Sequence, residues 1–452
     1  MKRKRPSFLA RLFKLILFLA FVGGLVLAWY YTRPGPMAFA SGKAVALDAY
    51  SAGHPTGTPA DFKGADALAR GRYLTEAADC KACHTADGGQ PFAGGLAFKL
   101  PFGTLYSANI TADKETGIGN WSDADFIGAI RDGVDDEGHR LYPAMPYAAY
   151  ANLTDEDALA IKAYLFSLPP VKSEAPENVL KFPFNQRWLM VFWSAVFNPK
   201  HRFMPVAEQS PEWNRGAYLV EGLAHCGECH TPRNLLQGLD NANKFAGGEA
   251  EGWRAYNITP DAASGVGAWS EADLIQYLST GHAKGRGSAS GPMAQAVEWS
   301  FSRLTASDIH AIVTYVLSVP AVKSAELPAP KEDPAPANPK QGVAVESSTR
   351  GKDIYAGACA SCHGWTGESL LAAEATLIGG RAINDPTATN VALMVLHGSQ
   401  FAPNDGSIAM PSFGGAYSDR EIAAVANYVT ARFGAKASAV TPEEVGKMRG
   451  MQ

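Results

Sequence analysis

The first apolar pattern along the chain is a run of 17 uncharged residues over positions 15–31. As a helix that rises about 1.5 Å per residue, this run is about 26 Å long, just enough to cross the core of a bilayer. Trp29, Tyr30 and Tyr31 end it where an aromatic interface belt is expected. Residues 1–40 are therefore predicted to be an uncleaved transmembrane anchor, with a signal peptide cleaved after Ala38-Phe39-Ala40 as the alternative.

Three later segments have the apolar spacing of amphipathic helices, over residues 158–168, 309–318 and 422–433. Each follows a Ser or Thr that has an acidic residue three positions on, which is typical of a capping box. A shorter helical segment with an Arg-Gly pair precedes each, at Gly71, Gly216 and Gly351. Because glycine allows a close approach of another backbone, we expect the first and last helices of each unit to cross there. Each opening segment also carries a tyrosine: Tyr73, Tyr218 and Tyr355. The closing helices carry tyrosines at matching places: Tyr164, Tyr315 and Tyr428.

An internal repeat links the first two units. The stretch Asn109-Ile-Thr-Ala-Asp113 returns as Asn257-Ile-Thr-Pro-Asp261, at an offset of 148 residues. Self-similarity at a fixed offset indicates two copies of one module. The third unit lacks this insert and is predicted to be a shorter version of the same plan.

Composition and charge narrow the class of protein. With 46% hydrophobic and 19% charged residues, the 452-residue chain resembles an ordinary folded protein of about three domains. Residues 1–14 hold six basic residues and no acidic one, so the other residues carry −10 against a total of −4. This balance excludes a basic nucleic-acid binder, and the positive-inside rule keeps the basic end in the cytoplasm. No Gly-x-Gly-x-x-Gly or P-loop motif suggests a nucleotide or flavin site.

All six cysteines fall in three copies of one motif: Cys80-Lys-Ala-Cys83-His84, Cys226-Gly-Glu-Cys229-His230 and Cys359-Ala-Ser-Cys362-His363. Two thiols one short turn apart reach the two vinyl groups of a porphyrin, and the adjacent imidazole becomes the proximal iron ligand. A zinc site would need two such cysteine pairs close together. A thioredoxin-like site would need a βαβ pattern. The motifs therefore predict three covalently bound haem c groups.

Each haem iron then needs a sixth ligand or leaves a position open. Met145, Met293 and Met410 each lie in a Pro-containing loop downstream of a motif, and Met145 and Met293 are again 148 residues apart. A thioether on a stiff loop is a soft ligand held at fixed reach. The rival ligands are His139 for the first site, His282 for the second and His397 for the third. His54, His201, His225 and His310 are interpreted as surface or structural residues.

The order of opening helix, CxxCH, methionine loop and closing helix resembles the class I cytochrome c fold. Longer stretches, among them Leu141-Tyr-Pro-Ala-Met-Pro-Tyr147 and Pro183-Phe-Asn-Gln-Arg-Trp188, resemble the tri-haem cytochrome subunits of bacterial membrane-bound dehydrogenases. The resemblance implies a mostly α fold of three tandem cytochrome c-like domains behind a transmembrane helix. An N-terminal spanning helix is not universal in that family, so the mode of membrane attachment is not carried over.

The resemblance also implies a function. Electrons would pass from a separate catalytic dehydrogenase subunit of quinoprotein, flavoprotein or molybdopterin type, through the haems, to ubiquinone. The haem domains would face the periplasm at the bacterial inner membrane, with membrane lipid and a small third subunit as further partners and no catalytic residue in this chain. A cytochrome subunit of a terminal oxidase and a peroxidase-like enzyme with one open iron are the alternatives.

Linkers complete the predicted organisation. Residues 171–210 form an apolar connector whose segment 188–197 could be a core helix, cover a haem edge, lie in the membrane surface or bind a partner. Residues 321–347 are rich in Pro and Ala, which predicts a semi-rigid exposed tether. The predicted ranges are 1–40 for the anchor, 62–170 for domain one, 211–320 for domain two, 348–433 for domain three and 434–452 for a tail.

Overall fold

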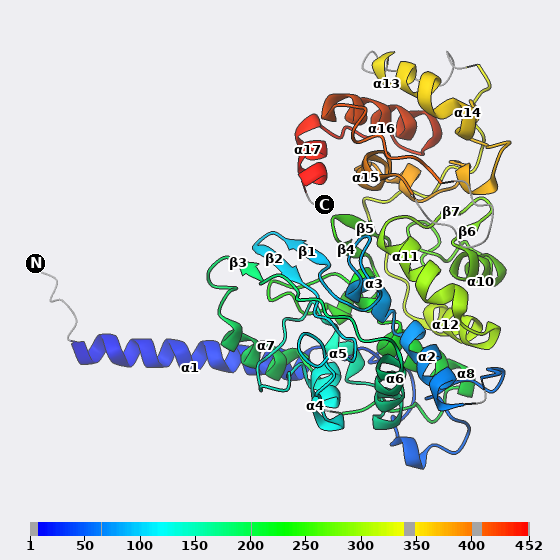
Figure 1. The fold of residues 1–452 in the computed structure, drawn as a ribbon. Helices are drawn as coiled ribbons and strands as arrows, with labels where there is room; N and C mark the ends of the chain where they lie inside the picture. Colours follow the sequence, from blue (N-terminus) through cyan, green and yellow to red (C-terminus); the bar gives the residue numbers. More distant parts are fainter. Residues whose placement is uncertain (1–7, 65, 200, 339–348, 400–408, 451–452) are drawn as a thin grey trace, which may run out of the picture.

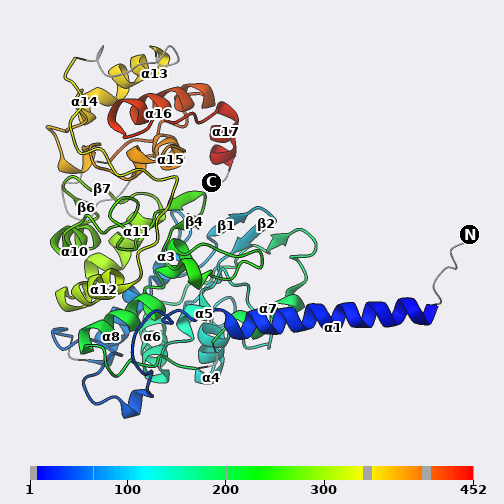
Figure 2. The same cartoon turned by 180° about the vertical axis from the view of Figure 1, so that it is seen from behind.

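The computed structural model describes residues 8–64, 66–199, 201–338, 349–399 and 409–450. The described chain is mostly helical, as predicted, and one long N-terminal helix extends away from the body (Figures 1 and 2). Its described strands are short; they form one three-stranded sheet and two two-stranded sheets, none of which was predicted. We refer to residues 62–170, 211–320 and 348–433 as units one, two and three.

Unit one opens with a helix that leads directly into the first cysteine motif. Its antiparallel strands β1 and β2 pair Phe98 with Leu105, and β3 (Val179–Leu180) from the connector adds to the β2 edge. The helices and strands of the unit are α2 (Ala67–Ala77), α3 (Cys80–His84), β1 (Ala97–Leu100), β2 (Gly103–Tyr106), α4 (Asp123–Ile127), α5 (Tyr147–Tyr150) and α6 (Asp155–Ser167).

Unit two repeats this order with further short strands. Its opening helix continues as a wide π-helical turn over Leu219–Leu223 toward the second motif. The unit contains α8 (Pro211–Tyr218), α9 (Gly227–His230), β4 (Gly248–Ala250), β5 (Trp253–Ala255), α10 (Glu271–Thr280), β6 (His282–Ala283), β7 (Gly287–Ser288), α11 (Pro292–Trp299) and α12 (Ala306–Ser318).

Unit three is shorter and contains no strand among its described residues. Its opening helix also ends in a π-helical turn, Tyr355–Cys359, ahead of the third motif. The unit contains α13 (Thr349–Ile354), α14 (Ala360–His363), α15 (Thr389–His397) and α16 (Asp419–Phe433). The predicted tail contributes a further helix, α17 (Pro442–Gly450), which buries Val445 and Met448 and joins α16 through an Arg449–Asp419 ion pair.

The first and last helices of each unit cross at the predicted glycines. A methyl group on Gly71 would stand 2.1 Å from the Ala160 carbonyl oxygen of α6. At Gly216 the distance to the Ala311 carbonyl oxygen would be 2.0 Å. Only glycine fits such a contact, so the predicted crossings are confirmed. The third crossing, at Gly351, has the same geometry against Ala424, and Tyr164, Tyr315 and Tyr428 flank the three crossings.

The internal repeat is visible in the hydrogen bonds. Asn109 accepts from the backbone and hydroxyl of Thr111 and donates to the Val171 carbonyl. Asn257 accepts from Thr259 and donates to the Val322 carbonyl in the same way. The 148-residue offset therefore reflects two copies of one loop structure.

Units one and two exchange buried hydrogen bonds across their contact. The Tyr73 hydroxyl of α2 donates to Asp308 of α12 at 2.6 Å, and the Tyr218 hydroxyl of α8 donates to Asp157 of α6 at 2.6 Å. Both carboxylates are fully buried, and each also accepts from the opening helix of its own unit, Asp157 from Arg70 and Asp308 from Arg215.

The same contact explains a departure from the predicted helix starts. Thr154 and Thr305 do cap the closing helices, but the acidic residues three positions on face the other unit instead of completing a capping box. Unit three keeps the complete box between Ser418 and Glu421.

Tyr355 differs from the other two opening tyrosines in its place and its contacts. Its hydroxyl donates to Gly364 within unit three, and its ring packs on Tyr428 and Phe433. Asp353 stands at the position that corresponds to Tyr73 and Tyr218, three residues after the arginine. Unit three therefore has no tyrosine hydroxyl at the position that, in units one and two, donates a hydrogen bond to a carboxylate of the opposite unit.

The Pro-rich linker is packed along unit three over its described part, residues 321–338. Leu327 and Ala335 are buried, and the Pro328 and Pro336 carbonyls accept from the partly buried Arg381 and the buried Arg432 side chains. Most of these residues are exposed, as predicted, but the contacts hold the segment against unit three, so it is not a free tether. Proline lacks an N–H but keeps its carbonyl, and here those carbonyls accept from guanidinium groups.

The N-terminal helix α1 (Phe8–Thr32) leaves the body beside the connector helix α7 (Met190–Phe197) (Figure 1). Trp29 packs edge-to-face on Phe197 at 6.1 Å, and Arg33 donates to the Val196 carbonyl. Among the described residues, no helix combines the length and the hydropathy needed to span a membrane, so the predicted transmembrane helix is not confirmed. The basic residues 2–5 lie outside the described part.

Helix α7 is only half buried. Ser194 is buried and Trp193 packs on Tyr147, whereas Trp188 just ahead of the helix and Phe192 within it are 60% and 63% exposed. The connector is therefore neither a fully buried core helix nor a loose segment.

Candidate haem sites

The three CxxCH motifs fold alike. In each, the histidine ends a short helix, α3, α9 or α14, that follows the opening helix after a tight bend. All six cysteines are partly buried and none forms a disulfide. Burial raises the pKa of the Cys80 thiol to about 12 and that of Cys359 to about 11. Such thiols stay protonated, unlike those of a catalytic thiol centre.

Each motif histidine has the same hydrogen-bond partner type. The Nδ1–H of His84 donates to the Ala108 carbonyl at 2.7 Å. His230 donates to Tyr256 and His363 to Ala375, each at 2.6 Å. This bond fixes the tautomer that leaves Nε2 unprotonated and free to bind a metal. Burial lowers the pKa of all three imidazoles, which also favours the neutral form.

One cavity of about 600 Å³ is lined by residues of all three motifs. Cys83 comes from the first, Cys226, Cys229 and His230 from the second, and Cys359, Cys362 and His363 from the third. The remaining lining is mainly apolar and includes Val266, Leu274, Ile312, Val391 and Val425. An apolar cavity with thiols and an imidazole at its wall fits covalent haem. Among the described residues, no three His, Cys, Asp or Glu side chains lie together in a group that could hold a metal ion.

Two of the predicted sixth ligands lie in this cavity. Met293 lines it in unit two and Met410 lines it in unit three. The rival His282 is not among the lining residues and pairs with the Ser288 hydroxyl at 3.0 Å. His397 also lies outside the lining, and its Nε2 is buried without a partner. The axial assignments themselves stay predictions.

The first site differs in its surroundings. Met145 is partly buried and, like Cys80, packs against the core cluster of units one and two. The rival His139 is 54% exposed and lies beside Asp135 and Glu137 on a surface loop. The structure thus places Met145, and not His139, toward the interior of unit one.

Several residues at these sites were not identified from the sequence. Met394 of α15 lines the unit-three part of the cavity beside Met410. Asp79 precedes the first motif with φ at 50°, and burial raises its carboxyl pKa. His225 precedes the second motif and packs on Tyr150 of unit one. Asp79 and His225 each stand directly before a motif cysteine, and this position in the sequence could have indicated that they belong to the haem sites.

Comparisons with known proteins agree with these sites. Residues 68–169 match the family described as cytochrome c, and residues 346–429 match the family described as cytochrome C oxidase, cbb3-type, subunit III. The gluconate 2-dehydrogenase cytochrome c subunit of Pantoea cypripedii is 40% identical over 86% of this chain and 91% of its own length. The fructose dehydrogenase cytochrome subunit of Gluconobacter japonicus is 39% identical over 84% of this chain and 82% of its own.

A third relative is larger. A nicotinate dehydrogenase subunit of Pseudomonas putida is 41% identical over 81% of this chain, but the chain spans only 30% of that relative's length. The matches over most of both chains, together with three CxxCH helices of one geometry, identify the fold and its cofactor type. The chain belongs to the family of cytochrome c subunits of dehydrogenases, which hold covalently bound haem c and transfer electrons.

Proposed function

We propose that this chain holds three haem c groups and carries electrons from a periplasmic dehydrogenase partner to ubiquinone. The observation that carries the proposal is the shared cavity, because Cys83 of the first motif lines it together with the cysteines and histidines of the second and third motifs. Bound haem iron supplies reversible one-electron chemistry. Cysteines of this chain would attach each haem covalently, histidine and methionine would bind its iron, and apolar side chains would exclude water.

The six residues that we assign as axial ligands are His84, Met145, His230, Met293, His363 and Met410. An iron with both axial positions filled exchanges electrons without binding substrate, which favours a relay over a peroxidase-like enzyme. The oxidase alternative is supported only by the match of unit three, whereas the dehydrogenase relatives match most of the chain. Substrate oxidation then belongs to a separate quinoprotein, flavoprotein or molybdopterin subunit.

The haem number is tested by intact-mass measurement of the mature chain. Three CxxCH motifs should give three haem additions and no thiol that can be titrated in the native protein. A mass with two additions would contradict the assignment of one site. The complex that co-purifies in detergent should also reduce a short-chain ubiquinone when its substrate is added.

We further propose that α1 holds the protein at the bacterial inner membrane, with the three units on the periplasmic side. Phe13, Phe18 and Phe21 of α1 are more than 60% exposed on a helix that extends away from the body (Figure 2). Exposed aromatic and aliphatic side chains on an isolated helix require an apolar environment. The aromatic residues at the end of α1 also lie against α7, which itself exposes apolar side chains.

Deletion of residues 1–33 behind a cleavable export signal tests this attachment. The haem-loaded chain, expressed without its partners, should move from the membrane fraction to the soluble fraction. A truncated chain that stays bound would make α7 the main attachment, and extraction at high salt would separate lipid insertion from charge attraction.

A further inference from the structure

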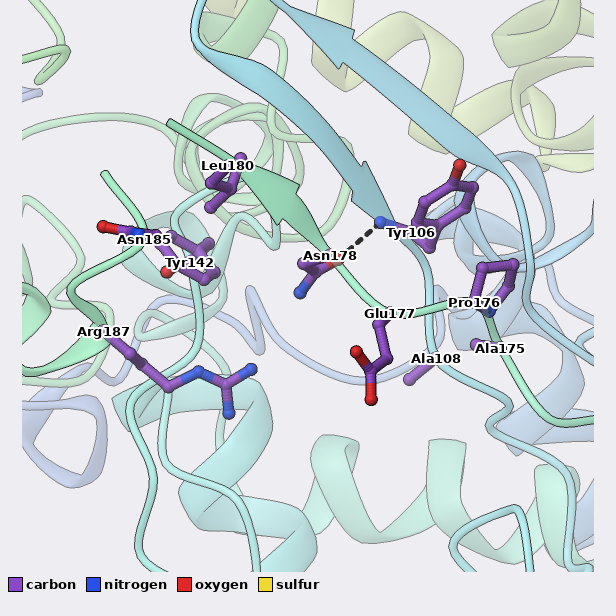
Figure 3. A pocket seen from close by; sticks show the side chains of 10 residues that line it. All are labelled: Tyr106, Ala108, Tyr142, Ala175, Pro176, Glu177, Asn178, Leu180, Asn185 and Arg187. Carbon is purple, nitrogen blue, oxygen red and sulfur yellow. Dashed lines mark hydrogen bonds between the residues drawn. The ribbon is translucent and has the colours of Figure 1, made fainter. Parts of the chain in front are cut away.

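A second pocket, separate from the shared cavity, opens on unit one. It has a volume of about 430 Å³ and lies between the end of β2, β3 and the segment that leads to α7 (Figure 3). Arg187 and Glu177 extend into it from opposite sides, and the Asn178 side chain accepts a hydrogen bond from the Tyr106 backbone at 2.8 Å. The lining is completed by Ala108, Tyr142, Ala175, Pro176, Leu180 and Asn185.

This pocket adjoins the first motif. Ala108 lines it, and the carbonyl of Ala108 accepts the Nδ1–H of His84 at 2.7 Å. Tyr142 also lines it and stands three residues before Met145 in the same loop. A molecule in the pocket would therefore touch the residue that orients His84 and the loop that carries Met145.

The internal repeat shows what this surface does in unit two. At the 148-residue offset, Tyr106 and Ala108 correspond to Arg254 and Tyr256. In unit two those residues meet unit three: the Arg254 backbone pairs with Asn390, and the Tyr256 hydroxyl donates to Asp385 at 3.2 Å. Asn178 occupies the place of Asn390, since it takes the same bond from the Tyr106 backbone. On unit one, the connector that carries Asn178 therefore takes the place of unit three, and the pocket lies between this connector and the corresponding face of unit one.

The pocket combines hydrogen-bond donors with an apolar margin. Arg187 carries five N–H donors, and its ion pair with Asp135 is long, at 3.8 Å; the Asn178 amide nitrogen is a further donor. Phe184 stacks on Phe102 at 4.1 Å beside the pocket, and Phe182 is 79% exposed. Residue 188 then leads into α7, which contacts α1.

We infer that this pocket binds the head group of a membrane quinone. A quinone ring is planar, carries two carbonyl acceptors and has a long apolar tail, which matches donors inside the pocket and apolar side chains at its margin. The inference rests on the proposed function, and it places the binding site of the quinone, the electron acceptor, on unit one. Reduction of the quinone to quinol takes two electrons and two protons; the electrons come from the substrate that the dehydrogenase partner oxidises, and the protons come from water at the exposed Glu177 side.

The test uses the detergent-purified complex of the haem-loaded chain with its dehydrogenase. Arg187→Gln removes the charged donor, and Ala175→Phe fills the pocket. Loss of a hydrogen bond to a charged group corresponds to roughly a tenfold weaker interaction. Both variants should raise the dissociation constant of decyl-ubiquinone about tenfold and should lower the ratio of quinone-supported to ferricyanide-supported turnover by a similar factor. Haem content and the three haem potentials provide the readout that is independent of turnover.

Arg303→Gln is the matched control. The Arg303 side chain is 40% exposed and forms an ion pair with Glu76 at 3.6 Å. The Arg187 side chain is 42% exposed and forms its ion pair with Asp135 at 3.8 Å. The two arginines are thus similar in exposure and pairing, but Arg303 lies in unit two, away from the pocket. The control should change neither the dissociation constant of decyl-ubiquinone nor the ratio of quinone-supported to ferricyanide-supported turnover. Unchanged quinone binding in both pocket variants would overturn the inference and leave the proposed function intact. Loss of haem would also overturn the inference, as would a shifted haem potential together with an equal reduction of the quinone-supported and ferricyanide-supported rates. Either result would show instead that the pocket residues help to hold a haem. A wild-type complex that reduces ferricyanide but no quinone would overturn the proposed function itself.

Discussion

At the scale of single residues, the three proximal histidines share one arrangement although their sequence contexts differ. His84, His230 and His363 each donate from Nδ1 to a backbone carbonyl, 24, 26 and 12 residues away along the chain. The CxxCH spacing determines which residues meet a porphyrin, but the tautomer depends on a carbonyl that the fold brings in. The same distinction applies to the sixth ligands: the sequence offers both Met293 and His282, and only the fold places one of them in the cavity.

Substitution of Met293 tests that choice. Met293→Ala should open one iron, so that the oxidised protein binds cyanide rapidly and loses about one third of its near-infrared Met-to-ferric band. His282→Ala should leave that band unchanged, because His282 pairs with Ser288 outside the cavity. Ligand-binding kinetics and the near-infrared spectrum decide the matter: an opened site in His282→Ala alone would make the second haem bis-histidine.

At the scale of elements, each unit is held by two helices that touch through a glycine. The closest approach is backbone to backbone, since the position of an added methyl group is 2.0–2.2 Å from a carbonyl oxygen in all three units. The opening helix carries its CxxCH motif directly after it, so the crossing also sets where the haem-binding residues lie. The crossing could be predicted from the Arg-Gly pairs and helix spacing because both signals are local.

Gly351→Ala should destabilise unit three by at least about 1–3 kcal/mol, the usual cost of overpacking a close contact. Gly357→Ala is the control, because a methyl group there would meet no atom within 4 Å. Urea unfolding followed by circular dichroism measures both. Equal midpoints for Gly351→Ala and the wild type would mean that the helices can separate without cost.

At the scale of the whole molecule, units one and two form a reciprocal pair and unit three attaches differently. Each of Tyr73 and Tyr218 donates to a buried carboxylate of the opposite unit, whereas unit three has Asp353 at that position. Unit three instead meets β5 of unit two through Asn390 and Asp385. The equivalent face of unit one meets the connector instead of another unit, and the second pocket lies between the two.

Tyr73→Phe and Tyr218→Phe each remove one bond between the units. Each should lower the free energy of unfolding by about 1.5–3 kcal/mol, because a buried carboxylate loses a donor. Tyr164→Phe serves as the comparison, since the Tyr164 hydroxyl has no hydrogen-bond partner among the described residues and its ring position at the helix crossing is kept. Urea midpoints no lower than that of Tyr164→Phe would show that the exchanged bonds add nothing to stability.

The sequence by itself determined the haem-binding motifs, the closing helices, the glycine crossings and the loop repeat. These features depend on residues close together in the chain or on a repeated local pattern, so spacing was sufficient. The tertiary structure decided which carbonyl orients each histidine and which acidic residues accept a hydrogen bond from another unit instead of completing a capping box. It also decided that the Pro-rich segment packs along unit three, that residues of all three motifs line one cavity and that the connector covers one face of unit one. Those features join residues that are tens to hundreds of positions apart, and a contact of that kind depends on how the units pack rather than on any local pattern.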